Sequence, residues 1–234
     1  MGGEHLSKQY DNDLETLRSA VLRMGGLVEA QIRGAIDAFA NGSQSLIDEV
    51  IAGESRVDEC EVSIDNDCSH IIVKRQPAAS DLRLIMAISK TVTDLERIGD
   101  EAEKIARMSK QIHERGRADA QHFASIRHAA DIALSMLRQA LDAFARLDAA
   151  HAASVIRQDV AIDTEFRSIL RQLITFMMED PRTISTALEI VWIAKAVERI
   201  GDHAKNIAES VIYIVKGTDI RHTKYAQLEG EALR

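Results

Sequence analysis

Proline is scarce in this chain: two prolines occur in 234 residues, a low count for a loop-rich or all-β protein. Glycine is also infrequent, with 12 residues, which excludes collagen-like or linker-like character. The hydrophobic fraction of 46% is too high for a disordered chain. Alanine, leucine, isoleucine, arginine and the acids dominate the composition, and most of these residues favour helices. We therefore predict an all-α protein.

Cysteine is equally rare, with Cys60 and Cys68 as the two examples and no CxxC motif. Eight residues apart on a helix, these two would lie about 12 Å from each other, too far for a disulfide bond. A cytoplasmic, reducing compartment is the simplest explanation of this usage.

Long apolar runs and an excess of basic residues are also missing. The most apolar stretch, 187–197, is interrupted by Glu189 and Lys195, so we expect no membrane span, and the polar N-terminal region predicts no signal peptide. Lys and Arg number 29 against 37 Asp and Glu, which gives a net charge of -8. This balance argues against a nucleic-acid partner and suits cations or basic partners.

Apolar residues recur every three to four positions along most of the chain, a pattern that predicts amphipathic helices. The first stripe runs from Leu14 to Phe39, and Asn41-Gly42-Ser43 ends it. We expect five more helices, at 44–75, 78–115, 119–147, 150–179 and 182–216. Helices of this length joined by short turns pack antiparallel.

The second half of the sequence repeats the first. Glu-Arg-Ile-Gly-Asp occurs at 96–100 and again at 198–202, and Val57-Asp58 corresponds to Ile162-Asp163. The offset between matching positions falls from 105 to 102 residues, a difference that loop lengths explain. We predict two repeated antiparallel three-helix bundles side by side, with units at 8–116 and 117–217 and a mobile C-terminal tail at 218–234.

The repeated pentapeptide places a glycine inside each of two helices. Glycine in a helix interior costs roughly 1 kcal/mol relative to alanine, so its repetition needs a reason. On a helical wheel Gly99 lies beside the face shared by Glu96 and Asp100, and the second copy repeats this arrangement. The missing side chain leaves room for a close helix, a partner or a bound ion.

Each unit also carries an acidic i, i+4 pair on the preceding helix. If these pairs face the acids of the pentapeptides, four carboxylates converge in each unit and raise one another's pKa. A hard multivalent cation would relieve this repulsion, and all-oxygen ligands favour magnesium, calcium, manganese or iron over zinc. A solvated polar face is the alternative, because the acids lie nearly opposite the apolar stripe. The candidate metal ligands are Glu96, Asp100, Glu198, Asp202, Glu54, Asp58, Asp159 and Asp163.

Two neighbours of the pentapeptides carry less specific expectations. Arg97 and Glu101 would form an ordinary surface pair at i, i+4. His203 follows Asp202 and is either a supporting ligand or a simple neighbour of Arg199.

The sequence closely resembles the PhoU family of phosphate-signalling proteins from about Leu14 to His222. The resemblance rests on both pentapeptide copies and on four further motifs, which are Met24-Gly25-Gly26, Lys74-Arg75-Gln76-Pro77 with Asp81-Leu82-Arg83, Phe176-Met177-Met178-Glu179-Asp180 and Val215-Lys216-Gly217. It implies a fold of two three-helix bundles. It also implies a cytoplasmic regulator that is not an enzyme.

The resemblance also implies that the protein is a negative regulator of the phosphate-starvation response. Such a protein is an adaptor that connects a phosphate ABC transporter, through its ATPase subunit, to a sensor histidine kinase, and it often forms a homodimer. In some members acidic E/D-xxx-D motifs hold iron or other metal clusters on the surface. Iron, manganese, zinc and magnesium are therefore candidate ions for the acids named above.

Other interpretations stay open at this point. A metal-dependent enzyme could use the carboxylate cluster, although the absence of histidine ligands and of a lid-like loop argues against it, and a metal-binding scaffold is a further alternative. Asp81-Leu82-Arg83 has no copy in the second unit, where Ser185-Thr186-Ala187 stands instead. Asp81 and Arg83 are thus candidate partner-binding residues, with stabilisation of a helix start as the competing explanation.

Overall fold

The structure, a computed structural model, describes residues 2–115 and 120–220. In this part of the chain it holds six α-helices and no strand, which confirms the all-α prediction. The helices are α1 (Gly2–Asn41), α2 (Gln44–Arg75), α3 (Ala79–Glu114), α4 (Ala120–Arg146), α5 (Ala149–Glu179) and α6 (Ile184–Lys216), and a short 3-10 helix, η1 (Pro181–Thr183), precedes α6.

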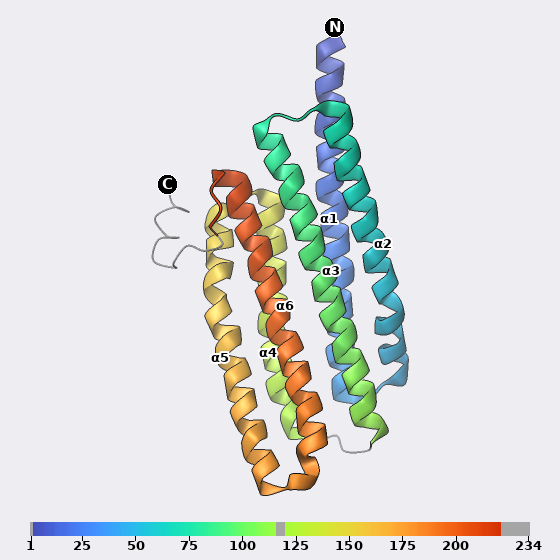
Figure 1. Ribbon diagram of the computed structural model, residues 1–234, viewed down its shortest axis with the longest axis vertical. Coiled ribbons are helices and arrows are strands. Elements are labelled where there is room, and N and C mark those ends of the chain that lie inside the picture. Colours follow the sequence, from blue (N-terminus) through green and yellow to red (C-terminus); the bar gives the residue numbers. More distant parts are fainter. Residues whose placement is uncertain (1, 116–119, 221–234) are drawn as a thin grey trace.

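The helices form two antiparallel three-helix bundles that lie side by side in one elongated molecule (Figure 1). Helices α1, α2 and α3 make the first bundle, and α4, α5 and α6 make the second. The bundles join where α3 packs against α6 and α1 packs against α4, so α2 and α5 lie on the outside. Short connections between consecutive helices impose this antiparallel order.

Local chemistry explains several helix ends. Ser43 caps α2 by accepting a hydrogen bond from the Leu46 backbone N–H at 3.5 Å, and Asp148 caps α5 by accepting one from that of His151 at 2.9 Å. Gly217 ends α6 with a φ of 74°, in the left-handed region that glycine adopts without strain. Pro77 lies two residues before Ala79, the first residue of α3, and so stands outside that helix.

The apolar stripes of all six helices meet in one continuous core of isoleucine, valine, leucine and alanine. The core includes Ile220, which is 3% exposed, so the tail predicted at 218–234 is packed at its beginning, and residues 221–234 lie outside the described part. Among the described residues no helix is both long and apolar enough to cross a membrane.

Candidate functional site: the acidic faces of the two bundles

The first acidic face lies along the contact between α2 and α3. Burial raises the pKa of Glu54, Glu96 and Asp100, and neighbouring negative charges add to this effect. Asp58 acts on all three of these carboxyls, and Asp100 acts on the other two, while Arg97 partly opposes the shift at Glu96 and Asp100. The structure therefore brings together the four carboxylates proposed for this unit.

Two further acids extend this face. Glu61 raises the pKa of Glu96, and Glu103 raises that of Glu54. Glu61 also accepts a hydrogen bond from the Thr93 hydroxyl at 3.1 Å, which ties α2 to α3. The face is partly buried between two helices, so its acids are not the fully solvated stripe that the helical wheel suggested.

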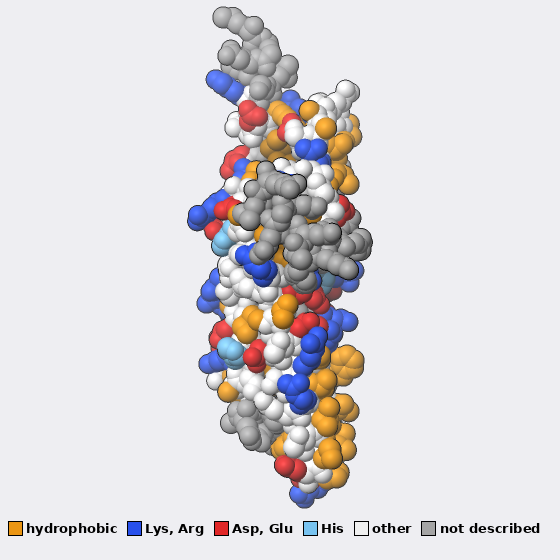
Figure 2. All heavy atoms as spheres, turned by 90° about the vertical axis from the view of Figure 1, so that its left-hand side faces the viewer, with side chains coloured by type: hydrophobic (Ala, Val, Ile, Leu, Met, Phe, Trp, Pro, Cys, Tyr) orange, Lys and Arg blue, Asp and Glu red, His pale blue; other side chains and the backbone are white. Residues whose placement is uncertain are grey.

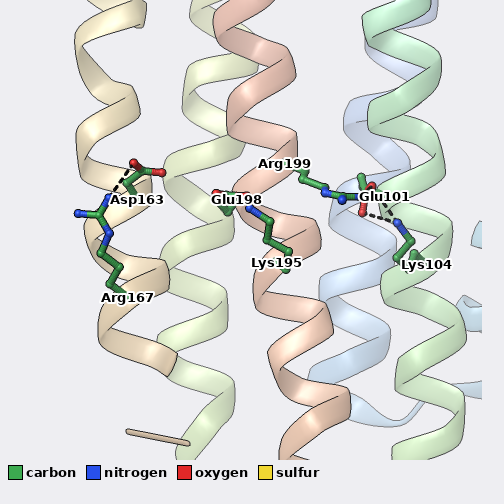
Figure 3. Close-up of polar contacts among 7 residues, drawn as sticks. All are labelled: Glu101, Lys104, Asp163, Arg167, Lys195, Glu198 and Arg199. Atoms are coloured by element: carbon green, nitrogen blue, oxygen red, sulfur yellow. Dashed lines mark hydrogen bonds and ion pairs between the residues drawn. The ribbon is translucent and has the colours of Figure 1, made fainter. Parts of the chain in front are cut away.

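The second acidic face, between α5 and α6, carries lysines among its acids. Lys205 Nζ donates to Asp159 Oδ2 at 2.7 Å, and Lys195 pairs with Glu198 (Figure 3). Burial raises the pKa of Asp202 to about 6, and the charges of Glu198 and Asp159 add to this shift while the two lysines oppose it. Three of the four predicted carboxylates thus converge here, with two cations beside them.

Asp163 is separate from this group. Its carboxylate forms an ion pair with Arg167 at 3.3 Å, one turn further along α5 (Figure 3). It is not among the charges that shift Asp202. An i, i+4 spacing places Asp159 and Asp163 on the same side of the helix, but the local arginine turns the second carboxylate to the surface.

The two faces differ at two equivalent positions. With the offset of 102 residues between the pentapeptides, Lys195 corresponds to Thr93 and Lys205 corresponds to Glu103. The first face thus has a hydroxyl and a carboxylate where the second has two ammonium groups. Negative charge is therefore concentrated on the first bundle, where a cation would be more strongly attracted.

A metal site would need several of these carboxylates to point at one common position. Within residues 2–115 and 120–220, no group of three or more His, Cys, Asp or Glu side chains has this arrangement. The first face nonetheless supplies an all-oxygen donor set, in which the pKa of Glu54, Glu96 and Asp100 is raised. Rotation of these side chains would be required for them to share an ion.

The glycine of each pentapeptide serves a close helix contact, one of the three uses considered for it. A Cβ atom at Gly99 would lie 3.3 Å from Val57 Cγ1 of α2 and from Gln31 Oε1 of α1. A Cβ atom at Gly201 would lie 3.0 Å from Ile162 Cγ2, the residue equivalent to Val57. Both glycines therefore let the outer helix approach the central one.

Glu101 is a structural residue that sequence reasoning placed wrongly. It is buried at 6% exposure and accepts from Arg199 Nη1 at 3.1 Å and from Lys104 Nζ at 2.8 Å (Figure 3). Arg97, its expected surface partner, contacts Glu96 instead, at 3.5 Å. The arginine of the second pentapeptide therefore joins α6 to α3, and the arginine of the first does not.

His203 also belongs to this contact between the bundles. Its Nδ1 lies 2.8 Å from Asp94 Oδ1, and Asn206 donates to the same oxygen at 3.0 Å. The side chain thus points from α6 towards α3 and not towards the acids of the second face. This position does not suit a supporting ligand there. Nothing in the local sequence indicated Asp94, because the contact depends on how two distant helices pack.

The predicted partner-binding residues both make contacts within the molecule. Asp81 lies in the first turn of α3, near Tyr10 of α1, and the pKa of Tyr10 rises to about 12 through burial and the charge of Asp81. The guanidinium of Arg83 lies against Gly217, whose Cβ position would be 3.5 Å from Arg83 Cζ. These contacts favour a structural role, in which a cation stabilises the C-terminal end of α6.

An exposed apolar surface lies at the end of the second bundle that is opposite Gly217, where α5 ends and α6 begins. Figure 2 shows hydrophobic side chains gathered along the lower right of that view. We name this surface the α5/α6 patch; its members, each at least 42% exposed, are Ile174, Met178, Ile184, Leu188 and Trp192. Five of the twelve large apolar side chains that are exposed in the described residues thus lie in one place, which is typical of an interaction surface.

The structure defines a class of protein: a duplicated helical bundle with an acidic face on each repeat. The family model of the PhoU domain matches the chain twice, at residues 21–109 and 126–211, and the chain belongs to the PhoU family. The two matches begin and end at the same offsets, 105 and 102 residues, that the repeated motifs show.

Curated relatives extend the likeness over nearly the whole chain. A protein of Pseudomonas aeruginosa named phosphate-specific transport system accessory protein PhoU homolog is 48% identical over 227 residues, covering 97% of this chain and 93% of the relative. The accessory protein PhoU of Escherichia coli is 44% identical over 229 residues, with 97% and 93% covered.

Two crystal structures show the same fold. That of PhoU from Pseudomonas aeruginosa has a TM-score of 0.86 at 48% identity and covers 89% of this chain and 100% of its own. That of the phosphate transport system regulatory protein PhoU from Streptococcus pneumoniae has a TM-score of 0.83 at 27% identity, with 90% and 98% covered.

Proposed function

We propose that this protein is a negative regulator of the phosphate-starvation response and that it acts without catalysis. The observation that carries the proposal is its likeness, over nearly full length, to proteins named as accessory to a phosphate-specific transport system. The duplicated helical fold supports a binding role, since it presents long helix faces to partners.

In this proposal the protein is a cytoplasmic adaptor between the ATPase subunit of a phosphate ABC transporter and a sensor histidine kinase. An adaptor transmits information only if its binding free energy differs between transporter states. We therefore expect its affinity for the ATPase subunit to depend on the bound nucleotide. Binding of the purified protein to the purified ATPase subunit, with ATP analogue or ADP present, measures this difference directly.

Deletion of the gene in its host tests the regulatory role. We expect a phosphatase reporter of the starvation response to be active in the deletion strain even when phosphate is plentiful, and a plasmid copy to restore repression. A reporter that stays at its basal level in the deletion strain would contradict the proposal. Hydrolysis of a phosphate ester by the metal-loaded protein, lost in Asp100→Asn, would contradict its non-catalytic part.

A second part of the proposal is that the first acidic face binds a multivalent metal ion. Glu54 and Asp58 on α2 and Glu96 and Asp100 on α3 would hold it, and its charge would relieve their repulsion and link the two helices. On the second face the lysines already balance Asp159 and Glu198, so we expect weaker metal binding there.

Matched double variants separate the two faces. Elemental analysis and titration with Mn²⁺ are made on the parent protein, on Glu96→Gln/Asp100→Asn and on Glu198→Gln/Asp202→Asn. We expect the first variant to lose most of the bound metal and the second to keep most of it. Equal losses in the two variants would contradict the expected preference for the first face, and no metal in the parent after reconstitution would return that face to a role in protein contacts.

A further inference from the structure

A groove between α1 and α2 of the first bundle has a buried glutamine in its wall. The groove has a volume of about 280 Å³, and Gln31, which lines it, is 8% exposed. Neither Nε2 nor Oε1 of Gln31 has a hydrogen-bond partner in the described part of the chain. An unpaired amide in a protein interior is unfavourable, so this glutamine needs a reason beyond packing.

The second bundle shows that the core does not require an amide at this position. With the offset of 105 residues, Gln31 corresponds to Met136, which is fully buried. The register is supported by the pentapeptide glycines, because Gly99 faces Val57 and Gly201 faces Ile162, again 105 residues on from Val57. An apolar side chain of similar length therefore serves the packing role in one bundle, and the amide in the other is an addition.

The groove itself is also specific to the first bundle. Gly34 and Gly53 line it, and their equivalents in the second bundle are Gln139 and Gln158. These two glutamines hydrogen bond to each other, at 2.8 Å and 3.2 Å, across the contact between α4 and α5. In the second bundle, two amide side chains thus fill this space. In the first bundle, the same space stays open beside an unpaired amide.

We propose that this groove binds a small molecule that carries a carboxamide. A carboxamide offers an N–H donor and a C=O acceptor, which match the unpaired Oε1 and Nε2 of Gln31. Gln139 and Gln158 show this kind of amide–amide pairing in the second bundle. The glycines and apolar side chains such as Leu27 and Leu46 would contact the rest of the ligand. The volume is at the lower limit of known ligand pockets, so the ligand is small.

Charges at the edge of the groove favour a zwitterion within this class. Glu49 and Arg56 both line the groove from α2, and neither forms an ion pair with another described residue. Their opposite charges suit the ammonium and carboxylate of a free amino acid such as glutamine. A Cβ atom at Gly53 would lie 2.9 Å from Gln31 Nε2, so this nitrogen lies just beneath the groove, while Oε1 faces Gly99 of α3. Rotation about the last torsion of Gln31, which has a broad energy profile, turns the amide towards a ligand.

The test is direct binding to the purified full-length protein, which does not depend on the proposed regulatory function. The probes are L-glutamine, propionamide, which keeps the carboxamide and lacks the charges, and L-glutamate, which replaces the carboxamide with a carboxylate. Chemical-shift changes of the backbone amides are followed during titration. We expect L-glutamine to bind with a Kd below about 1 mM and to shift signals from α1 and α2 around Gln31 and Gly53. We expect propionamide to bind more weakly at the same place, and L-glutamate at least about tenfold more weakly than L-glutamine.

Two variants distinguish ligand binding from packing. Gln31→Met copies the residue of the second bundle, and we expect it to melt at or above the parent temperature and to lose at least tenfold in affinity for L-glutamine. Ala30→Leu narrows the groove from the exposed side of α1 without changing the core, and we expect the same loss. Absence of binding by both carboxamide probes, or equal affinity in the parent and Gln31→Met, would overturn the proposal.

Discussion

Asp202 lies between two acids and two lysines on the second face, and its ionisation is linked to folding. Its pKa of about 6 in the folded protein exceeds the value of about 3.9 in an unfolded chain. The folded state therefore keeps a proton that the unfolded state has released, and the free energy of unfolding falls as the pH rises from about 4 to 6. After allowance for solvent screening, we expect this residue to account for a loss of about 1–2 kcal/mol.

The corresponding prediction is that Asp202→Asn removes this part of the pH dependence. The variant should be about 1–2 kcal/mol more stable than the parent at about pH 7 and close to it at about pH 4. Urea unfolding with a chelator present measures both values. Asp163→Asn is the matched control, because that carboxylate pairs with Arg167 at the surface, and its curve should follow the parent. A parent-like slope in Asp202→Asn would show that the carboxyl is not protonated in the folded state.

Gly25 and Gly26 provide a second comparison at the residue scale. A Cβ atom at Gly25 would lie 2.6 Å from Leu141 Cδ1 of α4, whereas one at Gly26 would meet nothing within 4 Å. We expect Gly25→Ala to lower the free energy of unfolding by about 1–3 kcal/mol, since either the Leu141 side chain or the contact between α1 and α4 must shift. Gly26→Ala should raise it by about 0.5–1 kcal/mol through helix propensity alone. Equal effects, measured by urea unfolding, would mean that Leu141 moves aside without cost.

Pairs of this kind also show the limit of single-residue inference. The sequence predicted that glycine in each pentapeptide has a purpose, and it left a close helix, a partner and an ion as alternatives. Helical periodicity gives the angle of Gly99 around its own axis, but it does not say which helix lies there. The structure supplies that information with Val57 and Gln31.

At the scale of elements, the contact between α3 and α6 gives the two pentapeptide arginines different roles. Arg199 donates to the buried Glu101 at 3.1 Å, whereas Arg97 contacts the half-buried Glu96 at 3.5 Å from an exposed position. We expect Arg199→Ala to destabilise the protein by about 1–3 kcal/mol, because it leaves a buried carboxylate with Lys104 as its remaining partner. Arg97→Ala should change stability by less than about 0.5 kcal/mol.

Thermal or urea unfolding of both arginine variants under the same conditions decides this prediction. A similar small effect of both would show that Lys104 alone satisfies Glu101. A large effect of Arg97→Ala would instead show that its contact with Glu96 holds the first acidic face together.

The helices themselves were largely predictable, and their partners were not. Periodicity and turn residues gave α2 at 44–75 and placed the boundaries of α3, α4, α5 and α6 within about two residues, because both signals are local. The start of α1 was missed: the predicted stripe begins at Leu14, whereas the helix begins at Gly2. The pairing of Glu101 with Arg199 joins two residues that are 98 positions apart in sequence, on different helices. The expected surface pair with Arg97 followed the i, i+4 rule, and a tertiary contact replaced it.

At the scale of the whole molecule, the duplication has produced two bundles with the same fold and different surfaces. The first acidic face has the arginines Arg97 and Arg107 beside its acids in place of lysines, and the first bundle leaves a groove beside Gln31. The second places Lys195 and Lys205 among its acids, fills the equivalent groove with Gln139 and Gln158, and exposes the α5/α6 patch. The residue differences follow from the sequence offsets between the repeats, but the contacts that these residues make are visible only in the structure. We infer that the first bundle binds small ligands and that the second bundle provides the protein contact.

That division leads to a prediction about self-association. We propose that a second copy of the chain covers the α5/α6 patch in a homodimer, since a two-fold symmetric interface needs only one surface that is complementary to itself. Exposed Trp192, 58% accessible, is the largest apolar side chain in the patch, and aromatic anchors of this kind commonly contribute about 2 kcal/mol or more to an interface. Trp192→Ser should therefore weaken the dimer by at least about thirtyfold in Kd.

Sedimentation of the parent and of Trp192→Ser over a range of concentrations measures this change. Val73→Ser is the control, because Val73 is 78% exposed on α2, in the other bundle, and its replacement should leave the association constant unchanged. If the parent dimerises and Trp192→Ser dimerises equally well, the dimer uses another face, and the patch is free for a different partner. A monomeric parent would also contradict the homodimer, and the five exposed apolar side chains would then be a candidate contact surface for another protein.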